Sequence, residues 1–311
     1  MAVFVTLSLA CGCAFITSDN ANEEPNQIEA AADGFWLDSG NYNTTFSGGS
    51  GSESDPYIIT TPQQFAGMGY LLQNDNLTYQ SSSFKLANDI DLGAHAWNPI
   101  KYTSYGATFD GNNHKITGLA IQYSQSQVSK KETNWGLFTT LSWDYSGTQP
   151  VFKNLTIETS SQSVFNYDYY TAQHVENGGI IAGTSTMVKY DNIKVVFNSK
   201  AIVYPYEKSV YFGGIVGFSF SDSFNNCFVT INASIEGGSV GSQDSGYVGG
   251  IAAFSSAASF NNCVSTGEIV YRSGAFSSLV FGGISGIDGR SSFTECINRV
   301  NLTSWFGDVI V

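Results

Sequence analysis

The sequence predicts an all-β fold, a right-handed parallel β-helix with about 33–38 residues per coil and a short N-terminal capping helix. A Gly-Gly-Ile motif starts at Gly178, Gly213, Gly249 and Gly282, so successive copies are 35, 36 and 33 residues apart. A second motif keeps the same period, an aromatic residue followed two positions later by Asn: Phe152-Lys-Asn154, Tyr190-Asp-Asn192, Phe224-Asn-Asn226 and Phe260-Asn-Asn262. The repeats are rich in Val, Ile, Phe, Ser and Thr, with the alternation of apolar side chains that is typical of strands.

Each repeat is predicted to hold a strand after the Gly pair (215–218), a bend, a strand after the Asn (227–235), and a third segment that returns to the next Gly pair. Three short strands per turn fit a parallel β-helix, in which equivalent residues of successive coils lie about 4.8 Å apart. Asn at the bend tolerates a left-handed backbone and can hydrogen-bond along the ladder. We expect the Gly pairs to permit positive φ and close approach of the coils at another corner. Glu295 replaces the bend Asn in a degraded fifth copy.

A capping helix is predicted where the strand at 57–59 ends. Thr61 is placed as the N-cap, Pro62 at the first helical position and Gln64 at the capping-box position. The residues that follow space their apolar side chains on one face of the helix: Phe65, Met68, Leu71 and Leu72. Such a helix would cover strand edges that the end of a β-helix otherwise exposes.

The chain divides into a signal peptide or lipoprotein signal (1–17), a polar tether and linker (18–48), the cap and first coils (49–140), and the repeat coils of the same domain (141–311). The apolar run 2–16 is too short to span a bilayer but suits a signal-peptide core. Simple cleavage and lipidation at Cys11 or Cys13 remain alternatives. We therefore expect an extracellular or cell-surface protein.

The net charge of the 311-residue chain is −13, from 13 basic and 26 acidic residues. This balance disfavours nucleic acid and anionic membrane surfaces as partners, so membrane contact is expected only through an N-terminal lipid anchor. The 42% apolar content excludes a globally disordered chain. The composition thus favours a folded, exported module.

Three cysteines share one repeat position: Cys227, Cys263 and Cys296. They are expected to stack in the core as small buried hydrophobes, beside inward-facing Val229 and Ile231. Parallel Cβ directions would strain a disulfide between neighbouring coils, and stacked interior positions cannot surround a metal ion tetrahedrally.

The first half of the domain carries further motifs, which are Asn88-Asp-Ile-Asp-Leu92, Phe109-Asp-Gly-Asn-Asn-His-Lys-Ile-Thr-Gly-Leu119 and Trp135-Gly-Leu-Phe138. With these motifs and the Gly-Gly-Ile turns, the chain resembles bacterial surface or secreted proteins that carry the GLUG motif, from Gly49 to about Cys296. The resemblance implies a pectin-lyase-like right-handed β-helix and a module of adhesin type. The chain departs from the pattern at Ala252-Ala253, where a Gly is usual, and at Glu295, where the bend Asn is usual. It also stops at Val311, which fits either a fragment or a short form capped by Trp305 and Phe306.

An enzymatic alternative depends on carboxylates. The candidates are Asp89, Asp91 and Asp110. Asp89 and Asp91 alternate around Ile90, so they share a solvent face and could bind Ca²⁺ or act as an acid/base pair. His114 and Lys115 lie nearby in sequence. The competing interpretation is a row of turn-forming acids. No catalytic residue is assigned, and Ca²⁺ is the one cofactor considered.

The third segment of each repeat carries clustered aromatic residues, which are expected to line one edge of the stack as a recognition strip. The candidate ligand-binding residues are Phe165, Tyr167, Tyr169, Tyr170, Tyr204, Tyr206 and Tyr211, with Tyr247 and Tyr271 in later repeats. Tyrosine offers an apolar ring and a polar tip to a sugar or a protein partner. The sequence therefore favours an adhesin-like module that binds a glycan or protein ligand; the alternatives are a polysaccharide-active lyase or hydrolase and a non-binding structural spacer.

Overall fold

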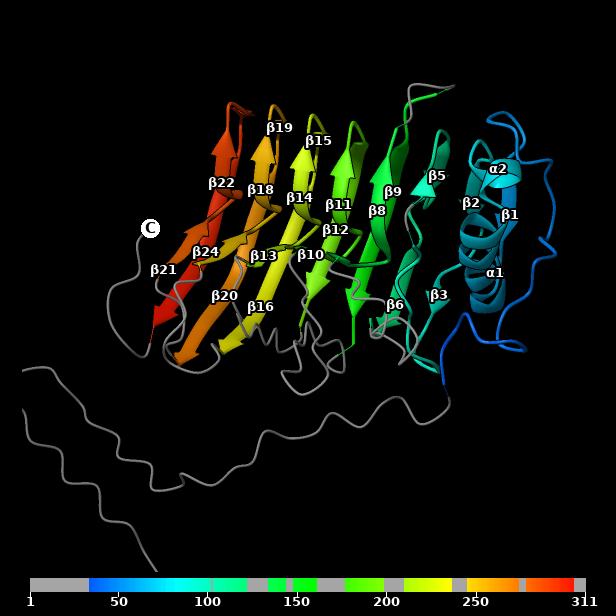
Figure 1. Ribbon diagram of the computed structural model, residues 1–311, viewed down its shortest axis with the longest axis horizontal. Helices are drawn as coiled ribbons and strands as arrows, with labels where there is room; N and C mark the ends of the chain where they lie inside the picture. Colours follow the sequence, from blue (N-terminus) through cyan, green and yellow to red (C-terminus); the bar gives the residue numbers. More distant parts are fainter. Residues whose placement is uncertain are drawn as a thin grey trace, which may run out of the picture.

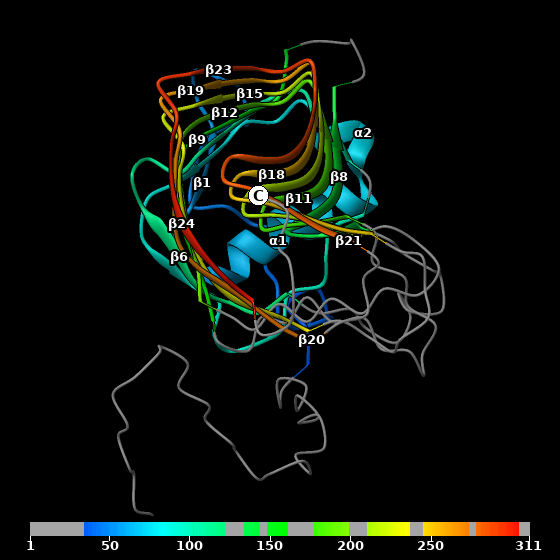
Figure 2. The same ribbon diagram turned by 90° about the vertical axis from the view of Figure 1, so that its left-hand side faces the viewer.

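The protein is a right-handed parallel β-helix with a capping helix packed at its N-terminal end, as the computed structural model shows (Figures 1 and 2). The structure describes residues 34–101, 103–121, 134–143, 148–160, 177–198, 210–236, 245–273 and 278–304. Within these residues all the strand pairings are parallel, and equivalent strands of successive coils pair with each other. The predicted fold class is confirmed.

In the described part of the chain, three sheets run along the axis. The first has 13 strands. One arm of it holds β1 (Tyr57–Ile59), β2 (Phe84–Leu86), β5 (Thr108–Asp110), β9 (Val151–Thr159), β12 (Lys189–Phe197), β15 (Ser223–Asn225), β19 (Ser259–Asn261) and β23 (Ser292–Thr294). The other arm adds β3 (Ile90–Asp91), β6 (Lys115–Leu119), β16 (Phe228–Glu236), β20 (Val264–Ser273) and β24 (Ile297–Ser304).

The other two sheets meet at the Gly pairs. The 5-stranded sheet holds β7 (Asn134–Trp135), β10 (Asn177–Gly179), β13 (Val210–Gly213), β17 (Ser245–Gly249) and β21 (Ser278–Gly282). The 6-stranded sheet holds β4 (Thr103–Ser104), β8 (Phe138–Ser142), β11 (Ala182–Thr186), β14 (Val216–Phe220), β18 (Ala252–Ser256) and β22 (Ser285–Gly289). The segment that leads to each Gly pair is thus itself a strand, such as β13.

The Asn ladder at the corner of the large sheet is confirmed. Asn154, Asn192 and Asn226 each have φ 53°, Asn262 has φ 50°, and Glu295 keeps φ 53° in their place. Asn192 Nδ2 donates to Asn154 Oδ1 at 3.0 Å, and Asn262 Nδ2 donates to Asn226 Oδ1 at 2.8 Å. Asn thus accepts the left-handed backbone and links successive coils at this corner.

The expectation of positive φ at the Gly pairs is wrong, although close approach of the coils is confirmed. Left-handed backbone occurs elsewhere, in a second ladder at Met187, Ser221, Ala257 and Arg290, with φ between 53° and 71°. At the Gly pairs the constraint is space: a Cβ on Gly213 would lie 2.0 Å from Val216 O, and one on Gly214 would lie 2.3 Å from Gly250 O. Glycine is required there because the neighbouring backbones leave no room for a side chain.

The core is a series of stacked ladders. Tyr190, Phe224, Phe260 and Phe293 stack with ring centroids 4.9, 4.7 and 4.9 Å apart; the first three are buried, and Phe293 in the last coil is exposed. Cys227 and Cys263 are fully buried beside Val229 and Ile231, whereas Cys296 in the last coil is partly exposed; all three are free thiols. The predicted stacking of the cysteines is confirmed.

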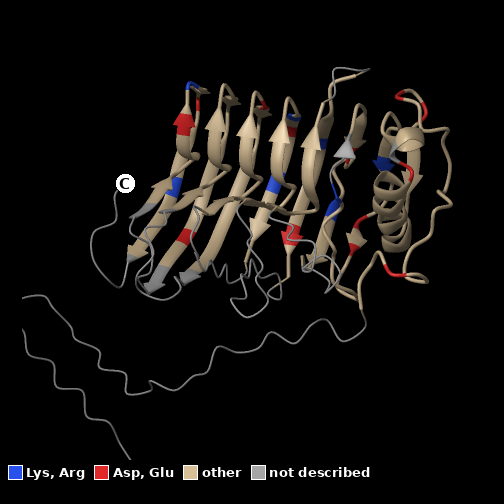
Figure 3. Ribbon diagram, viewed as in Figure 1, with Lys and Arg blue, Asp and Glu red and all other residues tan. Residues whose placement is uncertain are grey.

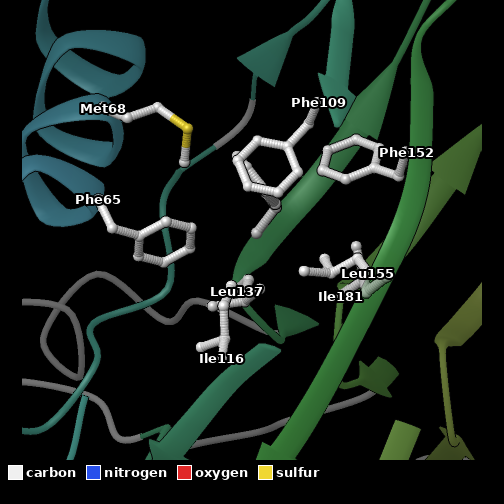
Figure 4. A pocket seen from close by; sticks show the side chains of 9 residues that line it. Phe65, Met68, Phe109, Ile116, Leu137, Phe152, Leu155 and Ile181 are labelled. Carbon is white, nitrogen blue, oxygen red and sulfur yellow. The ribbon is translucent and has the colours of Figure 1, made fainter. Parts of the chain in front are cut away.

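The capping helix α1 (Pro62–Asn74) begins as predicted, since the Thr61 side chain accepts a hydrogen bond from Gln64 N at 3.2 Å. The Gln64 side chain reaches back one residue further than a capping box would, to Thr60 N at 2.8 Å. Phe65 and Met68 of α1 face the first coils across a small apolar cavity (Figure 4). A short helix, α2 (Asn76–Tyr79), follows. Within the described residues, no helix is long and apolar enough to cross a membrane.

Candidate functional site

The predicted recognition strip is described only in part. Phe165, Tyr167, Tyr169, Tyr170, Tyr204 and Tyr206 lie outside the described residues, as do Cys11, Cys13, Trp305 and Phe306. Tyr211 lies on β13 with its ring partly exposed. Tyr247 occupies the equivalent position on β17, and the two rings stack with centroids 4.9 Å apart.

A second aromatic pair, which the sequence analysis did not single out, lies beside the tyrosines. Phe218 on β14 and Phe254 on β18 are partly exposed and stack 4.3 Å apart. The Tyr211 ring meets both phenylalanines edge-on, at 6.0 and 6.1 Å. We call Tyr211, Phe218, Tyr247 and Phe254 the aromatic cluster. Its two pairs come from different sheets and stand at right angles to each other.

The sheets bring these side chains together because the chain bends sharply at each Gly pair. Beyond the bend, the outward faces of the 5- and 6-stranded sheets lie against each other. A Cβ on Gly217 would lie 2.5 Å from Gly178 N, and one on Gly183 would lie 2.6 Å from the Asn134 Cβ. The small residues Gly183 and Gly217 thus let the two outer faces converge, and the larger side chains on both strands meet next to them.

The same surface is polar in the preceding coils. Asn134 and Asn177 precede Tyr211 on its ladder, and Thr140 and Thr184 precede Phe218. Asn177 Nδ2 donates to Asn134 Oδ1 at 2.8 Å, and Asn134 Nδ2 donates to Thr140 Oγ1 at 3.0 Å across the two sheets. Amide and hydroxyl groups therefore continue the line of aromatic rings along the axis.

The carboxylates of the enzymatic alternative have structural partners. Asp89 and Asp91 are exposed on either side of buried Ile90, as predicted. Asp89 Oδ1 accepts a hydrogen bond from Lys115 N at 3.1 Å and lies 3.1 Å from His114 Nδ1. These contacts, the backbone bond first, lower the pKa of Asp89. Asp89 is therefore ionised at neutral pH and unsuited to donate a proton.

Asp110 belongs to a row of alternating charge rather than to the Asp89 group. The residues in register on β2, β5, β9 and β12 are Lys85, Asp110, Lys153 and Asp191. Lys153 Nζ lies 3.7 Å from Asp110 Oδ2, and Asp110 Oδ1 accepts hydrogen bonds from Asn112 N and Asn154 Nδ2. Opposite charges in adjacent strands favour this register. The structure thus favours a structural role for Asp110.

Metal binding at Asp89 and Asp91 stays a prediction. Among the described residues, no group of three or more His, Cys, Asp and Glu side chains is placed to hold a metal ion. Asp91 Oδ1 accepts a hydrogen bond from Gly93 N at 2.9 Å, closing a turn. A calcium ion here would need ligands beyond these two carboxylates.

A buried acid that the sequence analysis missed lies under the second left-handed corner. Asp222 is 2% exposed, and its carboxylate accepts hydrogen bonds from Ser185, from Ser219 at 2.6 Å and from Val188 N at 2.8 Å. Burial raises the pKa of Asp222 to about 7 despite these donors. The network is enclosed in the core, so it bears on stability rather than on binding.

Comparison with known proteins supports the fold. Neither a protein-family model nor a curated protein sequence matches the chain. A similar solved structure is that of a Bacteroides ovatus protein provisionally named an immunoglobulin A1 protease. It is 21% identical, with a TM-score of 0.52 over 83% of this chain and 70% of the other. At this level of identity the likeness shows a shared β-helix fold and no shared residue roles.

Proposed function

We propose that the protein is a secreted or cell-surface β-helix module of adhesin type, which binds a glycan or an extracellular protein through the aromatic cluster. The observation that carries the proposal is the convergence of four partly exposed rings, Tyr211, Phe218, Tyr247 and Phe254, from two sheets. Aromatic side chains dominate the energetics of binding surfaces because they bury a large area at low entropic cost.

The sequence resemblance supports the same role. The GLUG-like motifs from Gly49 to about Cys296 are typical of bacterial surface and secreted proteins, and the β-helix fold agrees with that resemblance. We therefore propose membership of this group and export through residues 1–17, with either cleavage or a lipid anchor on Cys11 or Cys13. Cell fractionation, with Cys11→Ser and Cys13→Ser variants compared for membrane retention, tests this proposal.

The enzymatic alternative receives less support. The name of the Bacteroides ovatus protein points to a protease, but the two chains share the fold alone. In this chain Asp89 is ionised beside His114, and Asp110 lies between two lysines of its ladder. Neither carboxyl is placed as a general acid. A spacer without any ligand is the other alternative, and the binding experiment distinguishes it.

The test is retention of the full chain on an array of glycans and extracellular-matrix proteins, with calcium and with a chelator. We expect specific retention that Tyr247→Ala and Phe254→Ala each weaken. Phe228→Ala is the matched control, because Phe228 is 42% exposed on β16, in a different sheet. If the protein is folded by circular dichroism but is retained on no member of the array, the spacer alternative is favoured. Tyr167→Ala, Tyr169→Ala and Tyr206→Ala extend the test to the remaining predicted strip.

A further inference from the structure

Three outward-facing ladders form the surface around the aromatic cluster, and they share the absence of charge. The first, on the 5-stranded sheet, is Asn134, Asn177, Tyr211, Tyr247 and Val280. The second and third, on the 6-stranded sheet, are Thr140, Thr184, Phe218, Phe254 and Ile287, and Ser142, Thr186, Phe220, Ser256 and Gly289. We call these fifteen positions the uncharged strip.

Among the described residues, the outward ladders of the large sheet differ from the strip in their charge. The large sheet carries charged side chains on its own outward ladders, including Lys115, Lys153, Asp191 and Lys194. Charged residues make up 13% of the chain, and Figure 3 shows them on strands of the large sheet and on β22. Asp288 on β22 follows Ile287 and continues the inward ladder of Ser185, Ser219 and Ser255, but it is exposed in this coil and lies at the C-terminal end of the strip. Among the described residues, the fifteen positions of the strip are therefore uncharged, although the chain has a net charge of −13.

The chemistry of the strip also changes along the axis. Amide and hydroxyl groups come first, at Asn134, Asn177, Thr140 and Thr184, and the aromatic cluster follows in the next two coils. Phe220, which is 44% exposed, extends the aromatic part outward from Phe218. With about 4.8 Å between coils, the polar and aromatic parts together span about 14 Å.

We propose that the ligand of this surface is an uncharged polysaccharide lying along the axis of the β-helix, an inference that rests on the proposed function. Its hydroxyl groups would bond to the Asn and Thr side chains, while its apolar ring faces pack against the aromatic cluster. An acidic polysaccharide would bring carboxylate or sulfate groups onto a strip whose fifteen positions include no cation to pair with them. Protein interfaces tend to place Arg among their aromatic anchors, and the strip has none.

The experiment is titration calorimetry of the full chain with soluble uncharged glycans (a glucan, a mannan and a xylan) and with acidic ones (a polyuronate and a glycosaminoglycan). Each titration is run at low and at high sodium chloride. We expect an uncharged glycan to bind with an affinity that salt changes less than about twofold, since ionic strength screens only charged contacts. Tyr247→Ala or Phe254→Ala should weaken binding about tenfold, the equivalent of one aromatic contact. Phe228→Ala should leave it unchanged.

A charge introduced into the strip sharpens the distinction. Thr184→Lys places a cation beside the aromatic cluster. It should raise the affinity for an acidic glycan and lower the affinity for an uncharged one. Binding of acidic glycans alone, with a steep salt dependence and a gain in Thr184→Lys, would overturn this inference while leaving the proposed function in place. Binding of a protein alone, lost in Tyr247→Ala, would do the same. Absence of any ligand would overturn both.

Discussion

The Ser219 hydroxyl donates a 2.6 Å hydrogen bond to Asp222, a carboxylate enclosed in the core of the β-helix. Equivalent positions in the adjoining coils hold Val188 and Ala258, which are apolar. An isolated charge at this position is unfavourable because burial removes its hydration, and the hydrogen bonds offset only part of that loss. Asp222 therefore favours its neutral form in the folded protein.

Asp222 should make the protein less stable as pH rises toward neutrality. The folded-state pKa of Asp222, about 7, lies above the ordinary value of 3.8. The contribution of Asp222 to the free energy of unfolding is therefore fully present below about pH 4 and is lost as pH rises through 7. The loss amounts to at most about 4 kcal/mol by pH 8. Urea unfolding at several pH values should show this slope in the wild type and a flatter one in Asp222→Asn. Equal slopes in the two proteins would show that Asp222 does not cause the pH dependence of stability.

The Asn ladder predicts opposite effects at two equivalent positions. Asn192→Ala should lower the free energy of unfolding by about 1–2 kcal/mol, since Ala at φ 53° is strained and the bond to Asn154 is lost. Glu295→Asn should raise it by about 1 kcal/mol, because Asn adopts this backbone more readily. Thermal unfolding of both variants measures the two changes in stability. A destabilised Glu295→Asn variant would contradict the assigned role of the corner.

Glycine should be essential at the Gly pairs and dispensable at Gly48. Gly213→Ala places a Cβ 2.0 Å from Val216 O and should destabilise the protein by several kcal/mol. In Gly48→Ala, the control, the Cβ would meet nothing closer than 3.9 Å and should change stability little. Denaturant midpoints of the two variants test the contrast, and a stable Gly213→Ala would contradict close packing at this corner.

The cysteine ladder predicts graded reactivity toward a thiol reagent. Cys296 is partly exposed in the last coil, whereas Cys227 and Cys263 are fully buried. Under native conditions Cys296→Ser should therefore remove one fast-reacting thiol, and Cys263→Ser should remove none. Mass spectrometry after brief alkylation locates the labelled residues. Fast labelling of Cys227 in the folded protein would contradict the burial of this ladder.

The period and the Asn corner could be predicted from sequence because a stacked fold repeats its requirements at every coil. The Asn ladder shows the same residue type at each copy, and the start of α1 shows a local capping pattern at Thr61 and Pro62. Such features depend on local backbone geometry, which a short motif encodes. The stacking of the cysteines followed from the same period.

Other features depend on tertiary arrangement and were missed for that reason. The second left-handed corner holds Met187, Ser221, Ala257 and Arg290, four residue types that share no sequence signal. The role of the Gly pairs was misassigned because a motif does not distinguish a need for positive φ from a need for space. Tyr211 was a candidate, but its contact with Phe218 required knowing that two outer faces converge. Asp222 gave no signal because a single acid between strands usually marks an exposed turn.

The most direct test of the account is hydroxyl-radical footprinting of the full chain with and without the ligand that the array or titration identifies. We expect ligand binding to protect Tyr211, Tyr247, Phe218 and Phe254 from oxidation. Phe228, which is exposed on another sheet, should be oxidised equally in both samples. Protection of Phe228, or of residues near Asp89 and Asp91, without protection of Tyr247 would contradict the claim that the aromatic cluster is the binding surface.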